Sequence, residues 1–119
     1  MEQTTWQARA EEIHLQFVKQ AQSLGRLTSA DEITHFLALA IAGEAGELAN
    51  LVKKKWQGDV VDQQSLQEEI ADIRIYLEHM ARHLHIDINA ACEEKLKIVA
   101  ERLARKVVNA GVAGAVGGK

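Results

Sequence analysis

The chain has 119 residues, a formal charge of −3, one cysteine and no proline. Its 47% apolar and 26% charged residues are ordinary for one globular domain and too apolar for a disordered segment. The acidic balance argues against a nucleic-acid binder that uses a broad basic surface. The lone Cys92 cannot form an internal disulfide, and no apolar stretch approaches the ~20 residues of a membrane span. We therefore expect a cytoplasmic protein without nucleic-acid or membrane partners.

Apolar residues recur at intervals of three and four, which predicts helices along the whole chain. Ser29, with Glu32 three residues later, forms a capping box that predicts the start of the second helix. The four predicted helices cover about residues 5–24, 30–56, 64 or 65 to 83–86, and 87–108. We expect an all-α four-helix bundle. It forms a single domain over residues 1–108, and the glycine-rich tail at 109–119 is expected to be flexible.

Two of these helices carry acids where core residues are expected. In the second helix Glu44 projects into the apolar stripe and Glu47 lies at its border. In the third helix Glu69 lies on the edge of the stripe and Asp72 farther out, again at a border. Residues at i and i+3 are neighbours on a helix, so each helix is expected to point a pair of carboxylates inward. The two stripes consist of Leu37, Ile41, Leu48 and Val52 in the second helix, and Leu66, Ile70, Ile73, Leu77, Met80 and Leu84 in the third.

Inward-facing carboxylates need an explanation, because burying one ionised carboxylate costs several kcal/mol. Raised pKa values would keep some of the acids neutral. A divalent cation between them would neutralise the charge, and hard oxygen ligands in this number suit Mg²⁺ or Mn²⁺. Alternatively, Glu47 and Asp72 are solvated edge residues and Glu44 forms an ion pair with a buried lysine or arginine. Two matched pairs favour the metal site over this alternative.

Basic and aromatic residues supply further candidates. Lys95 projects close to the apolar stripe of the fourth helix, and Arg102 lies near the same azimuth. Lys95 either snorkels its ammonium to the edge or binds phosphate as a point charge. A nucleobase could stack on Trp56 or Tyr76. By contrast, His79, His83 and His85 are expected to be surface groups near a helix end.

The segment GEAGELANLVKKKWQGD at 43–59, followed by EEIADIRIYLEHMARHLHID at 68–87, resembles the MazG-like nucleoside triphosphate pyrophosphohydrolases. Their ExxE and ExxD signatures read here Glu44 to Glu47 and Glu69 to Asp72. The resemblance covers roughly residues 34–102. Within the superfamily it is strongest to the short, single-domain members related to dCTP pyrophosphatase and the integron-associated MazG proteins.

The resemblance implies Mg²⁺-dependent hydrolysis of a (deoxy)nucleoside triphosphate to the monophosphate and pyrophosphate. Nucleotide-pool housekeeping is the expected role, and clearance of modified nucleotides is the alternative that the sequence leaves open. It implies that Glu44, Glu47, Glu69 and Asp72 bind the metal. We expect that one of these acids, by preference Glu47, also accepts a proton from the attacking water. It also implies that Lys95 contacts phosphate and that Tyr76 shapes the nucleotide pocket. The further candidates for substrate binding are Trp56 and Arg102.

Apolar residues on a second helix face, Leu39 and Ile75, predict a homo-dimer or homo-tetramer. Two other functions are compatible with a helical bundle that carries inward-facing acids. A di-iron bundle needs inward ExxH pairs, but Glu11 to His14 and Glu32 to His35 project away from the apolar stripes and are expected to face solvent. A non-catalytic helical oligomeric interaction module stays the alternative, and it predicts no dependence on magnesium.

Overall fold

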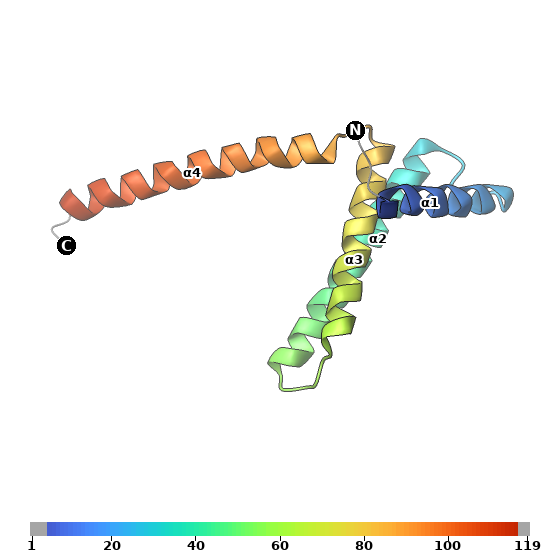
Figure 1. Cartoon of the computed structure of the whole chain (residues 1–119), viewed down its shortest axis with the longest axis horizontal. Coiled ribbons are helices and arrows are strands. Elements are labelled where there is room, and N and C mark those ends of the chain that lie inside the picture. The colour runs from blue at the N-terminus through green and yellow to red at the C-terminus, as the bar shows by residue number, and fades with distance from the viewer. Residues whose placement is uncertain (1–4, 117–119) are drawn as a thin grey trace. The chain divides into compact units, whose positions relative to one another are not determined.

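The computed structural model describes residues 5–116, which form four helices and no strand. Figure 1 shows α1 (Thr5–Ser23), α2 (Ala30–Trp56), α3 (Gln63–His83) and α4 (Ile88–Val116). The predicted all-α class is confirmed, and the bounds of the first three helices agree closely with the prediction.

The fourth helix is longer than predicted, because it continues beyond Val108 to Val116. Glycine weakens a helix by only about 1 kcal/mol per residue and keeps its N–H donor, so the glycine-rich segment does not end α4 as a proline would. The predicted flexible tail therefore lies largely within the bounds of α4, and its last three residues lie outside the described part of the chain. The flexibility of the tail stays a prediction.

The chain divides into two compact units, Met1–Ile86 and Asp87–Lys119. The first contains α1, α2 and α3, and the second contains α4. The single domain over residues 1–108 stays a prediction. Among the described residues, none of the four helices combines the length and the apolar composition that crossing a bilayer requires.

The α2 and α3 helices begin at side-chain caps. The Ser29 hydroxyl accepts a hydrogen bond from the Glu32 N–H at 3.1 Å, and the Glu32 carboxylate accepts one from the Thr28 hydroxyl at 2.9 Å. Asp62 caps α3 in the same way, because its carboxylate accepts the Ser65 N–H at 2.7 Å. Such caps satisfy N–H groups that have no partner within the helix. The predicted N-cap at Ser29 is confirmed.

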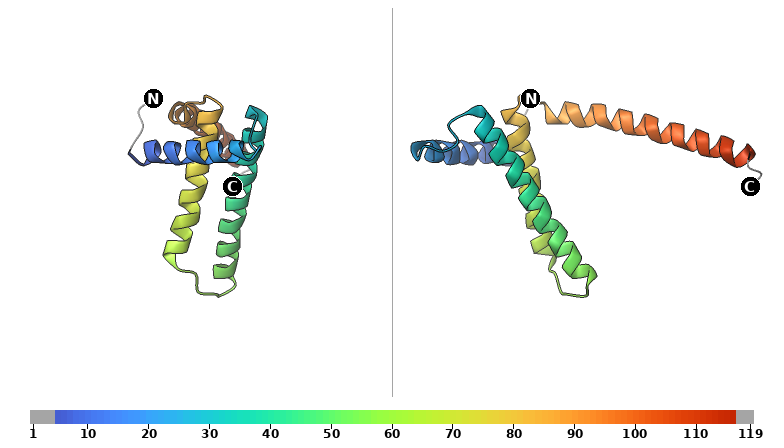
Figure 2. Two further views of the ribbon diagram at one scale, coloured as in Figure 1. Left: turned by 90° about the vertical axis from the view of Figure 1, so that its right-hand side faces the viewer. Right: turned by 180° about the vertical axis from the view of Figure 1, so that it is seen from behind.

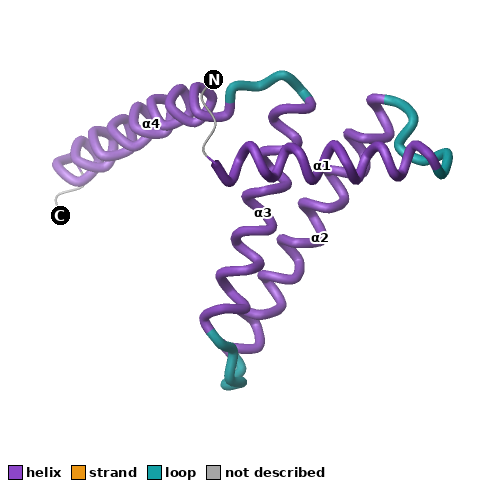
Figure 3. Tube along the Cα trace, turned by 45° about the vertical axis from the view of Figure 1, so that its right-hand side comes forward, coloured by secondary structure: helices purple, strands orange, loops and turns teal. Residues whose placement is uncertain are grey.

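The α2 and α3 helices lie side by side as an antiparallel hairpin, and α1 crosses it near the open end (Figures 1 and 2). The trace in Figure 3 shows the short loop at residues 57–62 that joins the two long helices. In this loop Gly58 has a φ of +99°, which a residue with a Cβ rarely adopts. The hairpin therefore brings the middle of α2 opposite the first half of α3.

The apolar core of the first unit is small. Leu37 has no exposed surface, and Ala81 is also buried. The predicted stripe is otherwise only partly covered, since Ile70 is 57% exposed and Leu77 is 39% exposed. Within the first unit the prediction that these two residues are buried is wrong, because α1 crosses the hairpin over a short stretch only.

Polar contacts attach α1 to α3. The Arg82 guanidinium lies 3.3 Å from the Glu11 carboxylate. Arg74 lies 3.0 Å from the buried Glu78 carboxylate, and its guanidinium also lies 5.7 Å from the ring centre of Trp6. A guanidinium within about 6 Å of an indole is attracted to the face of the ring. These contacts fix where α1 crosses the hairpin.

Candidate functional site

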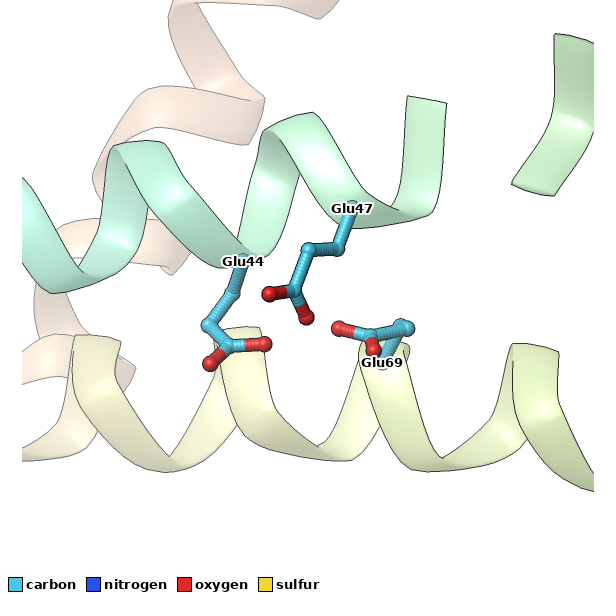
Figure 4. Close-up of side chains that lie close together, drawn as sticks. All are labelled: Glu44, Glu47 and Glu69. Atoms are coloured by element: carbon cyan, nitrogen blue, oxygen red, sulfur yellow. The ribbon is translucent and has the colours of Figure 1, made fainter. Parts of the chain in front are cut away.

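Three of the predicted acids converge between the two helices of the hairpin. Glu44 and Glu47 extend from α2 and Glu69 from α3, and their carboxylates point toward one another in Figure 4. One oxygen from each side chain lies within 4.8 Å of one oxygen from each of the others. We call these three residues the acidic triad. The i,i+3 spacing places the two α2 members on the same side of the helix, and the antiparallel hairpin supplies the third.

Burial makes this triad unfavourable without a counter-charge. Glu47 is exposed, whereas Glu44 and Glu69 are half-buried. The Oε2 atoms of Glu44 and Glu69 are both buried and have no hydrogen-bond partner. A proton on Glu69 can be donated to Glu44, and this hydrogen bond, together with desolvation and the nearby Glu47, raises the pKa of Glu69 to about 7. The triad can therefore hold either a proton or a cation.

The donor set fits a divalent cation. All three ligands are hard carboxylate oxygens, which Mg²⁺ and Mn²⁺ prefer. Oxygens on opposite sides of a bound Mg²⁺ are about 4.2 Å apart, so small side-chain rotations would bring the oxygens, now within 4.8 Å, into coordinating positions. The two unpartnered Oε2 atoms are the kind of buried acceptor that a cation would satisfy.

The raised pKa of Glu69 predicts a pH-dependent stability for the metal-free protein. The folded state holds the Glu69 proton more tightly than the unfolded state, where the pKa is about 4.5. This stabilisation is complete below pH 4.5 and is lost as the pH rises through about 7. In EDTA we therefore expect the unfolding temperature of the wild type to fall, relative to that of Glu69→Gln, between pH 5 and pH 7.5.

The control for this measurement is Glu12→Gln, which removes an exposed carboxylate from α1. Its unfolding temperature should follow the wild type across the same pH range. A constant difference between wild type and Glu69→Gln would contradict the prediction.

The fourth predicted ligand, Asp72, is not among the carboxylates of the triad. It lies three residues beyond Glu69 on α3 and lines a cavity of about 280 Å³. The other lining residues come from all three helices of the first unit, and they are Ile13, His14, Phe17, Phe36, Ile75, Tyr76 and His79. Asp72 thus lies between the triad and the cavity along α3, and its role as a metal ligand stays a prediction.

The cavity is rich in rings. Phe17 and Phe36 stack with their centres 5.3 Å apart, and Tyr76 meets the His79 ring edge to face at 6.1 Å. Flat rings of this kind provide surfaces for a planar ligand. The predicted pocket residue Tyr76 is therefore placed in a cavity that adjoins the acidic positions of α3.

The remaining predicted substrate-binding residues lie elsewhere. Trp56 ends α2 and is 89% exposed. Lys95 and Arg102 are exposed on α4, in the second unit. The roles proposed for these three residues stay predictions.

Two histidines were missed by the sequence analysis. His79 was expected at the surface, but it is buried. His14 was expected to face solvent, but its ring stacks on that of His79 with the centres 4.3 Å apart. Tyr76 follows Asp72 by four residues and His79 follows Tyr76 by three, which places all three on one face of α3. This spacing is the sequence signal that could have indicated that His79 lies in the cavity wall.

Comparison with known proteins supports the interpretation of the motifs. No family model matches the chain. The protein named dCTP pyrophosphatase 1 is 36% identical in Rattus norvegicus and in Mus musculus, over 50% of this chain and 39% of the relative. The protein of that name in Homo sapiens is 38% identical, over 52% of this chain and 41% of the relative. The matched segment thus spans well under half the length of these curated relatives. Over about half of its length, the chain is thus similar to proteins named dCTP pyrophosphatase 1, in agreement with the resemblance drawn from the motifs.

Proposed function

We propose that the protein hydrolyses a (deoxy)nucleoside triphosphate to the monophosphate and pyrophosphate with the help of a divalent cation, Mg²⁺ or Mn²⁺. The observation that carries the proposal is the acidic triad, whose buried Oε2 atoms on Glu44 and Glu69 have no partner. The name of the relatives, dCTP pyrophosphatase 1, supports the reaction type. Nucleotide-pool housekeeping is the role that we propose for this reaction.

In the proposed reaction, a water oxygen forms a bond to the α-phosphorus as the bond to the α,β-bridging oxygen breaks, and pyrophosphate leaves. Glu44, Glu47 and Glu69 would hold the cation, and a rotation of the Asp72 side chain would add a fourth carboxylate. The exposed Glu47 would accept the proton released by the attacking water, since it is the member of the triad that solvent reaches. A divalent cation bound there would neutralise the triphosphate and acidify a bound water.

The cavity suits the remainder of the nucleotide. Asp72 belongs both to the ExxD pair and to the cavity lining, so a triphosphate near the triad would leave its nucleoside close to Tyr76 and the two phenylalanines. Lys95 and Arg102 stay candidates for phosphate binding and Trp56 for base stacking. An assay of different nucleoside triphosphates identifies the preferred base and sugar.

The test is an assay of pyrophosphate release from the four common ribo- and the four common deoxynucleoside triphosphates, with Mg²⁺ and with EDTA. We expect turnover of at least one substrate, abolished by EDTA and restored by excess Mg²⁺ or Mn²⁺. No release from any substrate, together with no thermal stabilisation by Mg²⁺ and a non-hydrolysable nucleotide, would favour the non-catalytic interaction module instead.

We also propose that the protein is a homo-dimer or homo-tetramer. Half-buried and exposed residues of the hairpin, including Leu48, Ile70, Ile73 and Leu77, line an apolar groove of about 660 Å³. An exposed apolar surface of this kind is typical of an interface.

If two copies of the chain meet at this groove, a charge introduced there should disrupt the oligomer. We expect Ile70→Glu to lower the sedimentation coefficient at micromolar concentration toward that of a monomer, because the carboxylate would be buried in the interface. Leu15→Glu on α1, at a residue that is 56% exposed and outside the groove, should sediment like the wild type. A monomeric wild type would overturn the proposal.

A further inference from the structure

A histidine in the cavity wall has an unused polar atom. His79 belongs to α3, is only 6% exposed, and is one of the residues that line the cavity with Asp72 and Tyr76. Its Nδ1 atom is buried and has no hydrogen-bond partner. The mechanism proposed above does not use this residue.

Two neighbouring rings fix the orientation of His79. The His14 ring from α1 stacks on it, with the centres 4.3 Å apart and the planes inclined by 16°. The Tyr76 ring meets it edge to face, with an angle of 84° between the planes. A ring held from two sides cannot turn without breaking these contacts, so its nitrogen atoms are pre-oriented.

The ring is neutral at physiological pH. Burial lowers the pKa of His79 to about 4, and His14 and Arg82 act in the same direction, against the opposing carboxylates of Glu78 and Glu11. A neutral imidazole has one donor and one acceptor nitrogen. It can therefore distinguish ligands by their hydrogen-bonding pattern without attracting the triphosphate charge.

The cost of the unused nitrogen indicates a role in binding. A buried polar atom without a hydrogen-bond partner destabilises the folded protein, because the loss of its hydration is not compensated. Phenylalanine would stack on His14 and fill the same space without that cost, so packing alone gives no reason for a histidine here. A ligand in the cavity that hydrogen-bonds to the ring would offset the cost.

We propose that His79 is a specificity-determining residue, whose free ring nitrogen hydrogen-bonds to the edge of a nucleobase in the cavity. The inference rests on the proposed function and extends it to the choice of base. A site built to hydrogen-bond its substrate rejects substrates that leave its polar group unpaired. His79 thus sets the ratio of kcat/KM between triphosphates with different bases, whereas the acidic triad acts on the chemical step.

The experiment compares His79→Phe and His79→Asn with the wild type in the assay of eight triphosphates. Phenylalanine keeps a flat ring but removes both nitrogens, whereas the side-chain amide of asparagine reaches about as far as Nδ1. We expect His79→Phe to raise KM for the best substrate at least tenfold, to change kcat less than threefold, and to reduce its preference over the other bases. His79→Asn should recover part of that preference.

The matched control is His35→Phe, which replaces an exposed histidine of α2 outside the cavity. It should leave KM and the ranking of substrates unchanged. An unaltered ranking in His79→Phe would overturn the inference and leave the proposed function intact. A wild type that hydrolyses none of the substrates would overturn both.

A second measurement covers the case in which His79→Phe does not fold. In the wild type, the ring ¹⁵N resonances of the five histidines can be followed as Mg²⁺ and the α,β-imido analogue of the best substrate are added. We expect the His79 Nδ1 resonance to shift as a hydrogen bond forms, while those of His35 and His85 stay in place. A stationary His79 resonance at saturation would overturn the inference.

Discussion

Glu44→Gln is expected to lower kcat/KM for pyrophosphate release by about a hundred- to a thousandfold. Glutamine keeps the shape of the side chain but removes one of the charges that would hold the cation. The cation would lie between Glu44 and Glu69, whose buried Oε2 atoms have no other partner. The metal-free variant should be as stable as the wild type or more stable, since one repulsive charge is gone from the acidic triad. The loss of activity would then not be a loss of fold.

Thermal unfolding with and without Mg²⁺ provides the second readout. The wild type should gain several degrees at saturating Mg²⁺, because a ligand of the folded state stabilises it by about 2.7 kcal/mol at a hundred times its Kd. Glu44→Gln should gain almost none. The matched control is Glu68→Gln, an exposed neighbour of the triad whose carboxylate accepts a hydrogen bond from Gln64. Equal turnover in wild type and Glu44→Gln would exclude the metal site.

Leu37→Ala is expected to have the largest effect on stability, a loss of about 2–5 kcal/mol in the free energy of unfolding. Leu37 is the one large apolar side chain, among the described residues, that has no exposed surface. Its removal leaves a cavity where α2 is best covered, two turns before Glu44. Because the triad depends on the position of α2 against α3, the affinity for Mg²⁺ should fall as well.

Urea denaturation measures the first effect. Leu15→Ala is the control, since that leucine is more than half exposed on α1 and its truncation should change stability by no more than about 0.5 kcal/mol. Equal losses in the two variants would mean that the packing around Leu37 contributes little, for instance because an interface between copies dominates stability.

The acids could be found from sequence because the signal is local. Glu44 and Glu47 are three residues apart on one helix, and the helical period alone places them on neighbouring positions. Their meeting with Glu69 required only that two helices form an antiparallel hairpin, which a short loop favours. The position of Asp72 was not settled by the same reasoning, since it depends on how far each side chain reaches across the hairpin.

The histidines could not be found in this way, because their environment depends on the crossing of α1. On α1 the apolar Ile13 is 67% exposed, while the neighbouring His14 packs on His79. A helix that crosses its neighbours steeply touches them over a short stretch only (Figure 2). The period of its apolar residues then predicts that the segment is a helix. It does not predict which residues of the helix contact the neighbours.

The location of all three triad members in the α2–α3 hairpin has a consequence for folding. The residues 57–62 close a short loop, and a loop of this length costs little entropy. The hairpin can therefore form early and bring its carboxylates together before α1 docks. A cation that binds at this stage would stabilise the transition state for folding as well as the native state. Magnesium should then accelerate refolding as well as slow unfolding.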